Sequence, residues 1–179
     1  MSHPSDRPFR LSRLASLAVA LGLLSCLPAT VHATSDVLRP ADEVVVVKSE
    51  RRLYLMRDGQ PIRSYKIVLG LNPSGPKERE GDFRTPEGHY RLDLRNTSSD
   101  YFLSIHVSYP NDVDAVRARK KHLSPGGSIM IHGLPNVPKH STSYYNEADW
   151  TNGCIALAND DMLEVWLLTR SNTPIEIRP

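Results

Sequence analysis

Short strand-like runs separated by turn residues are the feature that most constrains this chain, and they occupy most of its length. Residues 44–47 form a β-branched run, a composition that is enriched in strands. Arg52–Arg57 and residues 62–69 flank the pair Asp58-Gly59, and both of these residues tolerate the positive φ angles of a tight hairpin turn. The pattern predicts a hairpin at this point and a β-rich domain around it.

The other periodic segments agree with this class. Residues 101–107 alternate strictly, as in a half-buried strand, and further strands are expected over residues 89–94, 128–132 and 173–177. Two short helices are expected, a polar one over residues 112–122 and one N-capped by Asn159. The second helix would bury a stripe made of Leu163, Trp166 and Leu167. We therefore predict a mainly β, single-domain fold with one or two short helices, and the strand order stays open.

The first 33 residues have the pattern of a secretory signal peptide rather than of the fold. Arg7, Arg10 and Arg13 precede an apolar run over residues 14–27, and a small-residue cleavage site ends at Ala33. The run is too short for a comfortable membrane span of about 20 residues. An anchor that is never cleaved is one alternative to release after Ala33.

A lipid anchor is a second alternative. The sequence Leu23-Leu24-Ser25-Cys26 resembles a bacterial lipobox, in which Cys26 would carry a lipid. Either way the chain is expected to be exported to the periplasm or cell envelope. We expect residues 34–42 to be a linker and residues 43–179 to be the folded domain. No membrane span is expected in the mature chain.

Charge excludes one class of partner. The whole chain carries a formal charge of +2, but its first 33 residues contain three arginines and one aspartate, so the mature part is formally neutral. A neutral domain without a concentrated basic stripe gives no support to nucleic-acid binding. No phosphate-binding glycine loop and no metal-ligand spacing occur in the sequence, so no cofactor and no metal site are expected.

Cysteine usage points to a reactive thiol. Once the leader is removed, Cys154 is the only cysteine of the chain. Exported proteins usually pair their cysteines, so a lone thiol is either buried and inert or retained for reactivity. A nucleophilic thiol needs a base, and His132 is the best candidate because it ends a predicted strand next to Gly133. A backbone carbonyl near Gly133 could hold its second ring nitrogen.

The residues around the cysteine suit an oxyanion-binding turn. Thr151, Asn152 and Gly153 precede it, and glycine allows backbone N–H groups to approach a developing negative charge. If His132 activates Cys154, alkylation of the thiol should stay fast below the pH at which a free cysteine slows. Taken singly, however, each of the two residues is more often structural than catalytic.

The joint pattern is more specific. His132-Gly133 at a strand end, then about twenty residues, then Thr-x-Gly-Cys-Ile resembles the signature of the L,D-transpeptidase catalytic domain (YkuD) family. Residues 81–90 resemble the Thr-Pro-x-Gly-x-aromatic segment of the same family. The resemblance implies a β-rich sandwich-like fold, Cys154 as nucleophile and His132 as base. It also implies attack on the carbonyl after the meso-diaminoacid of a peptidoglycan stem peptide, through a thioester.

Three departures from the family pattern, two residue differences and a slightly long loop before the cysteine, leave the reaction open. Many members have His where this chain has Asn152, and Arg or Asn where it has Ala156. The long loop before the cysteine contributes Tyr144, Tyr145 and Trp150 as candidate cleft residues, and His106 is a fourth. Three hypotheses follow: transfer of the acyl group to an amine, hydrolysis that releases a peptide or a wall-linked protein, and an idle wall-binding module.

Overall fold

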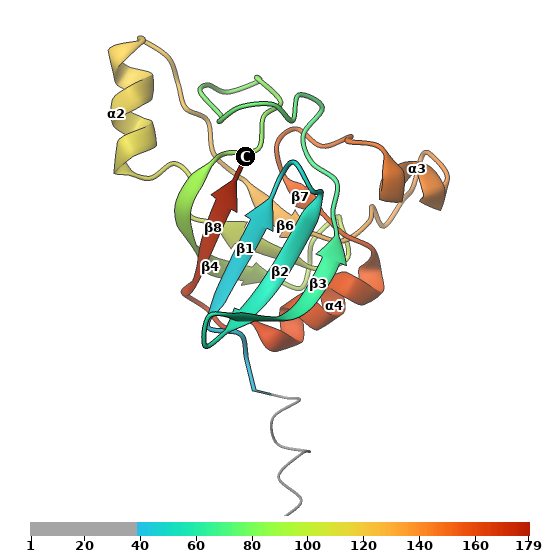
Figure 1. The fold of residues 1–179 in the computed structure, drawn as a ribbon. Helices are drawn as coiled ribbons and strands as arrows, with labels where there is room; N and C mark the ends of the chain where they lie inside the picture. Colours follow the sequence, from blue (N-terminus) through green and yellow to red (C-terminus); the bar gives the residue numbers. More distant parts are fainter. Residues whose placement is uncertain (1–38) are drawn as a thin grey trace, which may run out of the picture. The chain divides into compact units, whose positions relative to one another are not determined.

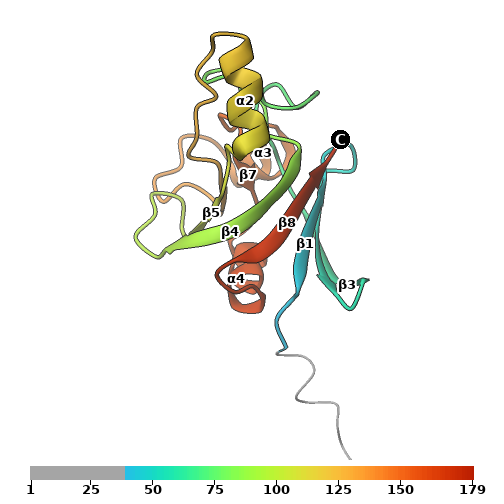
Figure 2. The same cartoon turned by 90° about the vertical axis from the view of Figure 1, so that its left-hand side faces the viewer.

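The computed structural model describes residues 39–179, so the predictions for the signal peptide, the lipobox and most of the linker lie outside the described residues. The described part contains a single eight-stranded sheet in the order β3-β2-β1-β8-β4-β5-β6-β7 (Figures 1 and 2). Within residues 39–179 no helix is both long and apolar enough to cross a membrane.

The first three strands of the chain form one end of the sheet. β1 (Glu43–Val47), β2 (Arg52–Arg57) and β3 (Gln60–Lys66) are antiparallel neighbours, and β8 (Thr173–Arg178) pairs in parallel with β1. β4 (Gly88–Asn96) and β5 (Ser104–Val107) continue the sheet, followed by β6 (Met130–His132) and β7 (Ile155–Ala156). These bounds confirm the mainly β prediction.

The predicted hairpin is present and has its expected turn. Asp58 has φ 51° and Gly59 has φ 73°, and the flanking residues Arg57 and Gln60 pair across β2 and β3. Positive φ at both central residues matches the right-handed twist of the flanking strands.

The sheet curls until its two ends meet. Beyond β3, Val68 forms an antiparallel bridge with Ala156 in β7, and their two backbone hydrogen bonds are each 2.9 Å long. Gly70 forms a second bridge, with Thr151. The chain after β3 is thereby fastened to the segment that carries Cys154, so the walls of the curled sheet enclose one core.

Within residues 39–179 three helices accompany the sheet, one more than the one or two that the sequence suggested. α2 (Asp112–Lys120) and α4 (Asn159–Leu168) were expected, whereas α3 (Thr142–Glu147) lies inside the long loop before the cysteine (Figure 1). Ser141 caps α3 by accepting a hydrogen bond from the Tyr144 N–H, a local signal that the sequence analysis did not use.

Two details of α4 were predicted wrongly. Its N-cap is Ala158, not Asn159, and the Asn159 side chain is engaged elsewhere. Its buried face consists of Met162, Val165 and Leu168, while Leu163 and Leu167 are exposed. The buried face is therefore displaced by one residue, or about 100° around the helix axis, from the predicted stripe, of which only Trp166 packs against the core, partly buried.

One strand is shorter than its alternation suggested. β5 begins only at Ser104 because Phe102 adopts a positive φ of 59° and its N–H donates to the Asn136 side chain at 2.9 Å. The chain therefore bends before the strand begins. Tyr101, which precedes this bend, becomes part of the site described below.

Strand alternation places the core residues. Leu53 and Leu55 of β2 are fully buried, and so are Val44 and Val46 of the neighbouring β1. β4, β5 and β8 contribute pairs on the same inner face, so the core runs along the inside of the curled sheet. The pairs are Tyr90 and Leu92 in β4, Ile105 and Val107 in β5, and Ile175 and Ile177 in β8.

Removal of one core leucine should measure how strongly this packing stabilises the fold. Leu53→Ala is expected to lower the free energy of unfolding by about 2–5 kcal/mol, because it deletes buried methyl groups and leaves a cavity. Leu94→Ala makes the same chemical change at a side chain that is 68% exposed and should stay within about 0.5 kcal/mol of the parent. Urea unfolding of both variants checks this, and equal losses would contradict the assigned core.

Candidate active site

The parallel pairing of β6 and β7 brings the two predicted catalytic residues together. His132 is in register with Ala156, and Ile131 with Ile155. Because side chains alternate along each strand, His132 projects on the same side of the sheet as the position two residues before Ala156, which is Cys154. The thiol and the imidazole both line one cavity of about 400 Å³.

His132 is held as a neutral base. Its side chain is buried, and Nδ1 lies 2.7 Å from the Gly133 carbonyl oxygen, the kind of backbone acceptor that the sequence analysis expected. A carbonyl can only accept, so Nδ1 carries the proton and Nε2 keeps its lone pair. Burial lowers the pKa of His132 to about 4, although the Gly133 hydrogen bond opposes this shift. The ring packs against Tyr101 and Trp150, at 4.7 and 5.6 Å between centroids.

Cys154 rests as a thiol rather than a thiolate. Desolvation raises its pKa, while the Met130 N–H and the positive charge of Lys77 act in the opposite direction. The Met130 nitrogen lies 3.4 Å from Sγ, and Sγ lies 3.6 Å from the Ser128 carbonyl oxygen, to which the thiol can donate. Burial thus disfavours the free thiolate in the resting protein, and the expected fast alkylation at low pH stays a prediction.

The turn before the cysteine is stabilised internally. The Gly153 N–H donates to Thr151 Oγ1 at 3.1 Å, and the Thr151 hydroxyl donates to the Cys154 carbonyl at 2.8 Å. The Gly153 amide is thus engaged within the turn and not free to bind an oxyanion, while the oxyanion-binding role of the turn as a whole stays a prediction. Glycine is needed there for another reason: its φ is 125°, and an added Cβ would lie 2.6 Å from the Arg84 carbonyl oxygen. Asn152 and Thr151 both line the cavity.

The backbone around Gly133 is held by Asn159, a residue whose role the sequence analysis missed. The Asn159 side-chain oxygen accepts the Leu134 N–H at 2.8 Å, and a Cβ on Gly133 would lie 2.6 Å from that oxygen. Asn159 thus holds the backbone whose carbonyl orients His132. The signal was present, since this asparagine follows the cysteine at a short distance, but it was interpreted as a helix cap.

Only one of the four predicted cleft residues lines the cavity. Trp150 does so, and its indole N–H donates to the Tyr145 carbonyl at 3.1 Å. Tyr145 is buried behind Trp150, with ring centroids 5.1 Å apart, whereas Tyr144 stacks on His140 away from the cavity. His106 is paired with Asp93 at 2.7 Å and does not reach the cavity, because its ring turns towards β4.

The opposite wall of the cavity was not predicted. It is formed by the polar connection between β4 and β5 and by the start of β5, together with Ser128 and Met130. The run of short polar residues between two predicted strands was the signal that could have revealed it. The residues of this connection that line the cavity are Asn96, Ser98, Ser99, Asp100, Tyr101 and Ser104.

The cavity has no metal-binding character. Among residues 39–179, no three histidine, cysteine or carboxylate side chains gather closely enough to hold an ion. What the arrangement offers is a thiol, a neutral imidazole with one free nitrogen, and a polar wall. That combination is suited to nucleophilic attack with general-base assistance.

Comparison with known proteins decides the family. The model of the L,D-transpeptidase catalytic domain (YkuD) matches residues 41–177, which is most of the chain. The chain belongs to this YkuD family. Its eight-stranded curled sheet is accordingly the YkuD fold, as the resemblance implied.

Individual relatives agree with this assignment. A protein of Escherichia coli strain K12 named "Putative L,D-transpeptidase YafK" is 34% identical over 96 residues, covering 50% of this chain and 37% of its own length. The helical cell shape determining protein Pgp2 of Campylobacter jejuni is 28% identical with a TM-score of 0.59, over 75% of this chain and 46% of Pgp2. The chain therefore spans less than half the length of either protein.

A more distant structure supports the fold alone. An L,D-transpeptidase from Mycobacterium smegmatis has a TM-score of 0.50 at 15% identity, over 76% of this chain and 58% of that one.

The second departure from the YkuD pattern has a structural counterpart. Ala156 stands at the position where many members have Arg or Asn. It is buried, and both its N–H and its carbonyl form hydrogen bonds with the backbone of Val68. It contributes nothing to the cavity wall, and no lysine or arginine of the described residues lines the cavity. The cavity wall of this YkuD domain is therefore built without a lysine or arginine among the described residues.

The depressed pKa of His132 should appear as acid sensitivity of the fold. The folded state takes up the His132 proton near pH 4, whereas an unfolded histidine does so near 6.5. Between these values the unfolded state binds more protons, so stability falls as pH falls, by roughly 3 kcal/mol across the window. His132→Gln should remove this part of the slope in urea unfolding between pH 7 and 4.

A matched control is available in the same domain. His89 has a side chain that is 80% exposed, so His89→Gln should keep the slope of the parent protein. An unchanged slope in His132→Gln would show that the imidazole is not held neutral by burial.

Proposed function

We propose that this chain is a cysteine acyltransferase of the L,D-transpeptidase type that acts on peptidoglycan stem peptides. The observation that carries the proposal is the neutral His132, with Nδ1 fixed on the Gly133 carbonyl and Nε2 free, in the same cavity as the Cys154 thiol. Such a histidine can accept a proton from the thiol at the moment of attack.

The reaction would proceed in two steps. Sγ of Cys154 attacks the carbonyl after the meso-diaminoacid while its proton moves to Nε2 of His132. The C–N bond to the terminal D-amino acid breaks, that proton passes to the leaving amine, and a thioester remains. A second amine then attacks the thioester and restores the thiol. Since the Gly153 amide is engaged, stabilisation of the oxyanion falls to other groups on the cavity wall, with Asn152 among them.

Hydrolysis on the same scaffold is the second candidate. Its supporting observation is the absence of any lysine or arginine among the described residues that line the cavity. A stem peptide with a free terminal carboxylate would find no cation there. A leaving group without that carboxylate, such as a wall-linked protein or peptide, would suit this wall better. Water would then replace the second amine.

A peptidoglycan substrate requires an enzyme outside the cytoplasmic membrane, in the periplasm or cell envelope. The predicted leader over residues 1–33 agrees with this proposal. A role in cell shape is a reasonable extension, because the structurally similar Pgp2 of Campylobacter jejuni is a helical cell shape determining protein.

Product analysis should distinguish the hypotheses. The protein is incubated with tetrapeptide muropeptides, with and without a diamino-acid acceptor, and with a protein–wall conjugate. Mass spectrometry is expected to find products that vanish in Cys154→Ala and fall about 10²–10⁴-fold in His132→Ala, because the base is lost. His140→Ala is the matched control, since His140 lies outside the cavity.

Each outcome has a clear meaning. Cross-linked or exchanged products support the transferase, and release without new cross-links supports the hydrolase. An absence of turnover on every substrate would contradict both and favour the idle wall-binding module. Full activity in Cys154→Ala would show that Cys154 is not the nucleophile.

A further inference from the structure

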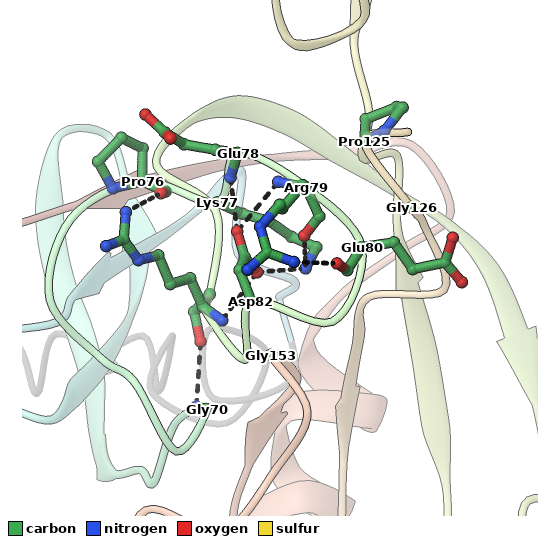
Figure 3. A network of polar contacts seen from close by, with 12 residues as sticks. Gly70, Pro76, Lys77, Glu78, Arg79, Glu80, Asp82, Pro125, Gly126 and Gly153 are labelled. Atoms are coloured by element: carbon green, nitrogen blue, oxygen red, sulfur yellow. Dashed lines mark hydrogen bonds and ion pairs between the residues drawn. The ribbon is translucent and has the colours of Figure 1, made fainter. Parts of the chain in front are cut away.

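A buried ion pair lies in the loop that packs against the turn before the cysteine (Figure 3). The Asp82 carboxylate accepts a hydrogen bond from Lys77 Nζ at 2.7 Å, and the two side chains are only 9% and 3% exposed. It also accepts the backbone N–H groups of Glu78, Arg79 and Arg84, at 2.7, 3.0 and 3.1 Å. A single side chain therefore fixes the backbone between residues 78 and 84.

This loop presses directly on the backbone that carries Cys154. An added Cβ on Gly153 would lie 2.6 Å from the Arg84 carbonyl oxygen, and one on Gly70 would lie 2.0 Å from the Phe83 carbonyl oxygen. The Asn72 N–H donates to that same Phe83 carbonyl at 3.1 Å. Backbone thus packs on backbone without intervening side chains. A shift of Arg84, whose N–H is held by Asp82, would move Gly153.

The pair also bears on the charge of the site. Lys77 is a buried ammonium whose other hydrogen bond is to the Arg79 carbonyl at 3.0 Å, and its charge acts on the Cys154 thiol in favour of the thiolate. The other titratable groups among the described residues that line the thiol's cavity are His132, Asp100 and Tyr101. Asp82 itself faces Lys77 and acts electrostatically on Tyr109.

We propose that Asp82 and Lys77 form a positioning unit for Cys154. In this unit the carboxylate holds the loop against Gly153 and holds the Lys77 ammonium in place within that loop. Neither residue lines the cavity, so neither is expected to touch substrate. The inference rests on the proposed function only in taking Cys154 as the reactive thiol.

Loss of either partner should have the same effect on the thiol. Lys77→Met removes the positive charge directly. Asp82→Asn removes it indirectly, because a buried ammonium without its counter-ion either gives up its proton or moves to solvent. A carboxylate that acted only as a nearby negative charge would have the opposite effect, since its removal would make the thiolate easier to form. The direction of the change therefore separates the two explanations.

The test is the pH dependence of Cys154 alkylation by iodoacetamide in the full chain, followed by mass spectrometry of the peptide that contains Cys154. Lys77→Met and Asp82→Asn are each expected to move the rate profile to higher pH by about half to one unit, which is roughly a three- to tenfold loss of thiolate at a fixed pH. Glu78→Gln is the matched control. It removes a carboxylate from the same loop, but one that forms only an exposed pair with Lys121, and its profile should not move.

Several outcomes would overturn the inference. An unmoved profile in Lys77→Met would do so, and a shift to lower pH in Asp82→Asn would also do so. If Asp82→Asn fails to fold, Lys77→Met still decides, because Asp82 then keeps its three backbone donors. Alkylation needs no wall substrate, so a failure of the proposed reaction on muropeptides would leave this test valid.

Discussion

The parallel pairing of β6 with β7 is the contact on which the site depends. It places Cys154 and His132 on one side of the sheet although 22 positions separate them in the chain. The pairing is secured from outside by the bridge between Val68 and Ala156, which closes the curled sheet. Closure of the sheet and assembly of the proposed catalytic pair are therefore the same structural event.

Burial then sets the chemistry of the pair. The same dry surroundings lower the pKa of the imidazole and raise that of the thiol, so the resting site holds two neutral groups. In the proposed reaction the ion pair of thiolate and imidazolium would form only during attack, which avoids the cost of burying separated charges in the free protein. His132 remains able to accept a proton because its other nitrogen is occupied by the Gly133 carbonyl.

Local patterns made much of this structure predictable. The Asp58-Gly59 turn and the alternating strands follow from residue types alone, and the family signature pointed to Cys154 and His132. The remaining features depend on contacts between distant segments. The sequence around Gly153 does not reveal that Arg84 lies against it, nor that Asn159 reaches back to Leu134. The buried side of α4 was missed because apolar residues lie on two faces of this helix, and only tertiary packing selects Met162, Val165 and Leu168 over Leu163 and Leu167.

The most direct test is to trap the covalent intermediate. The protein is mixed with a stem tetrapeptide, quenched in acid and mapped by mass spectrometry. The account predicts that the peptide containing Cys154 gains the mass of the acyl group without its terminal D-amino acid. Turnover with an adduct on another residue, or with none on Cys154 under conditions that trap thioesters, would contradict it.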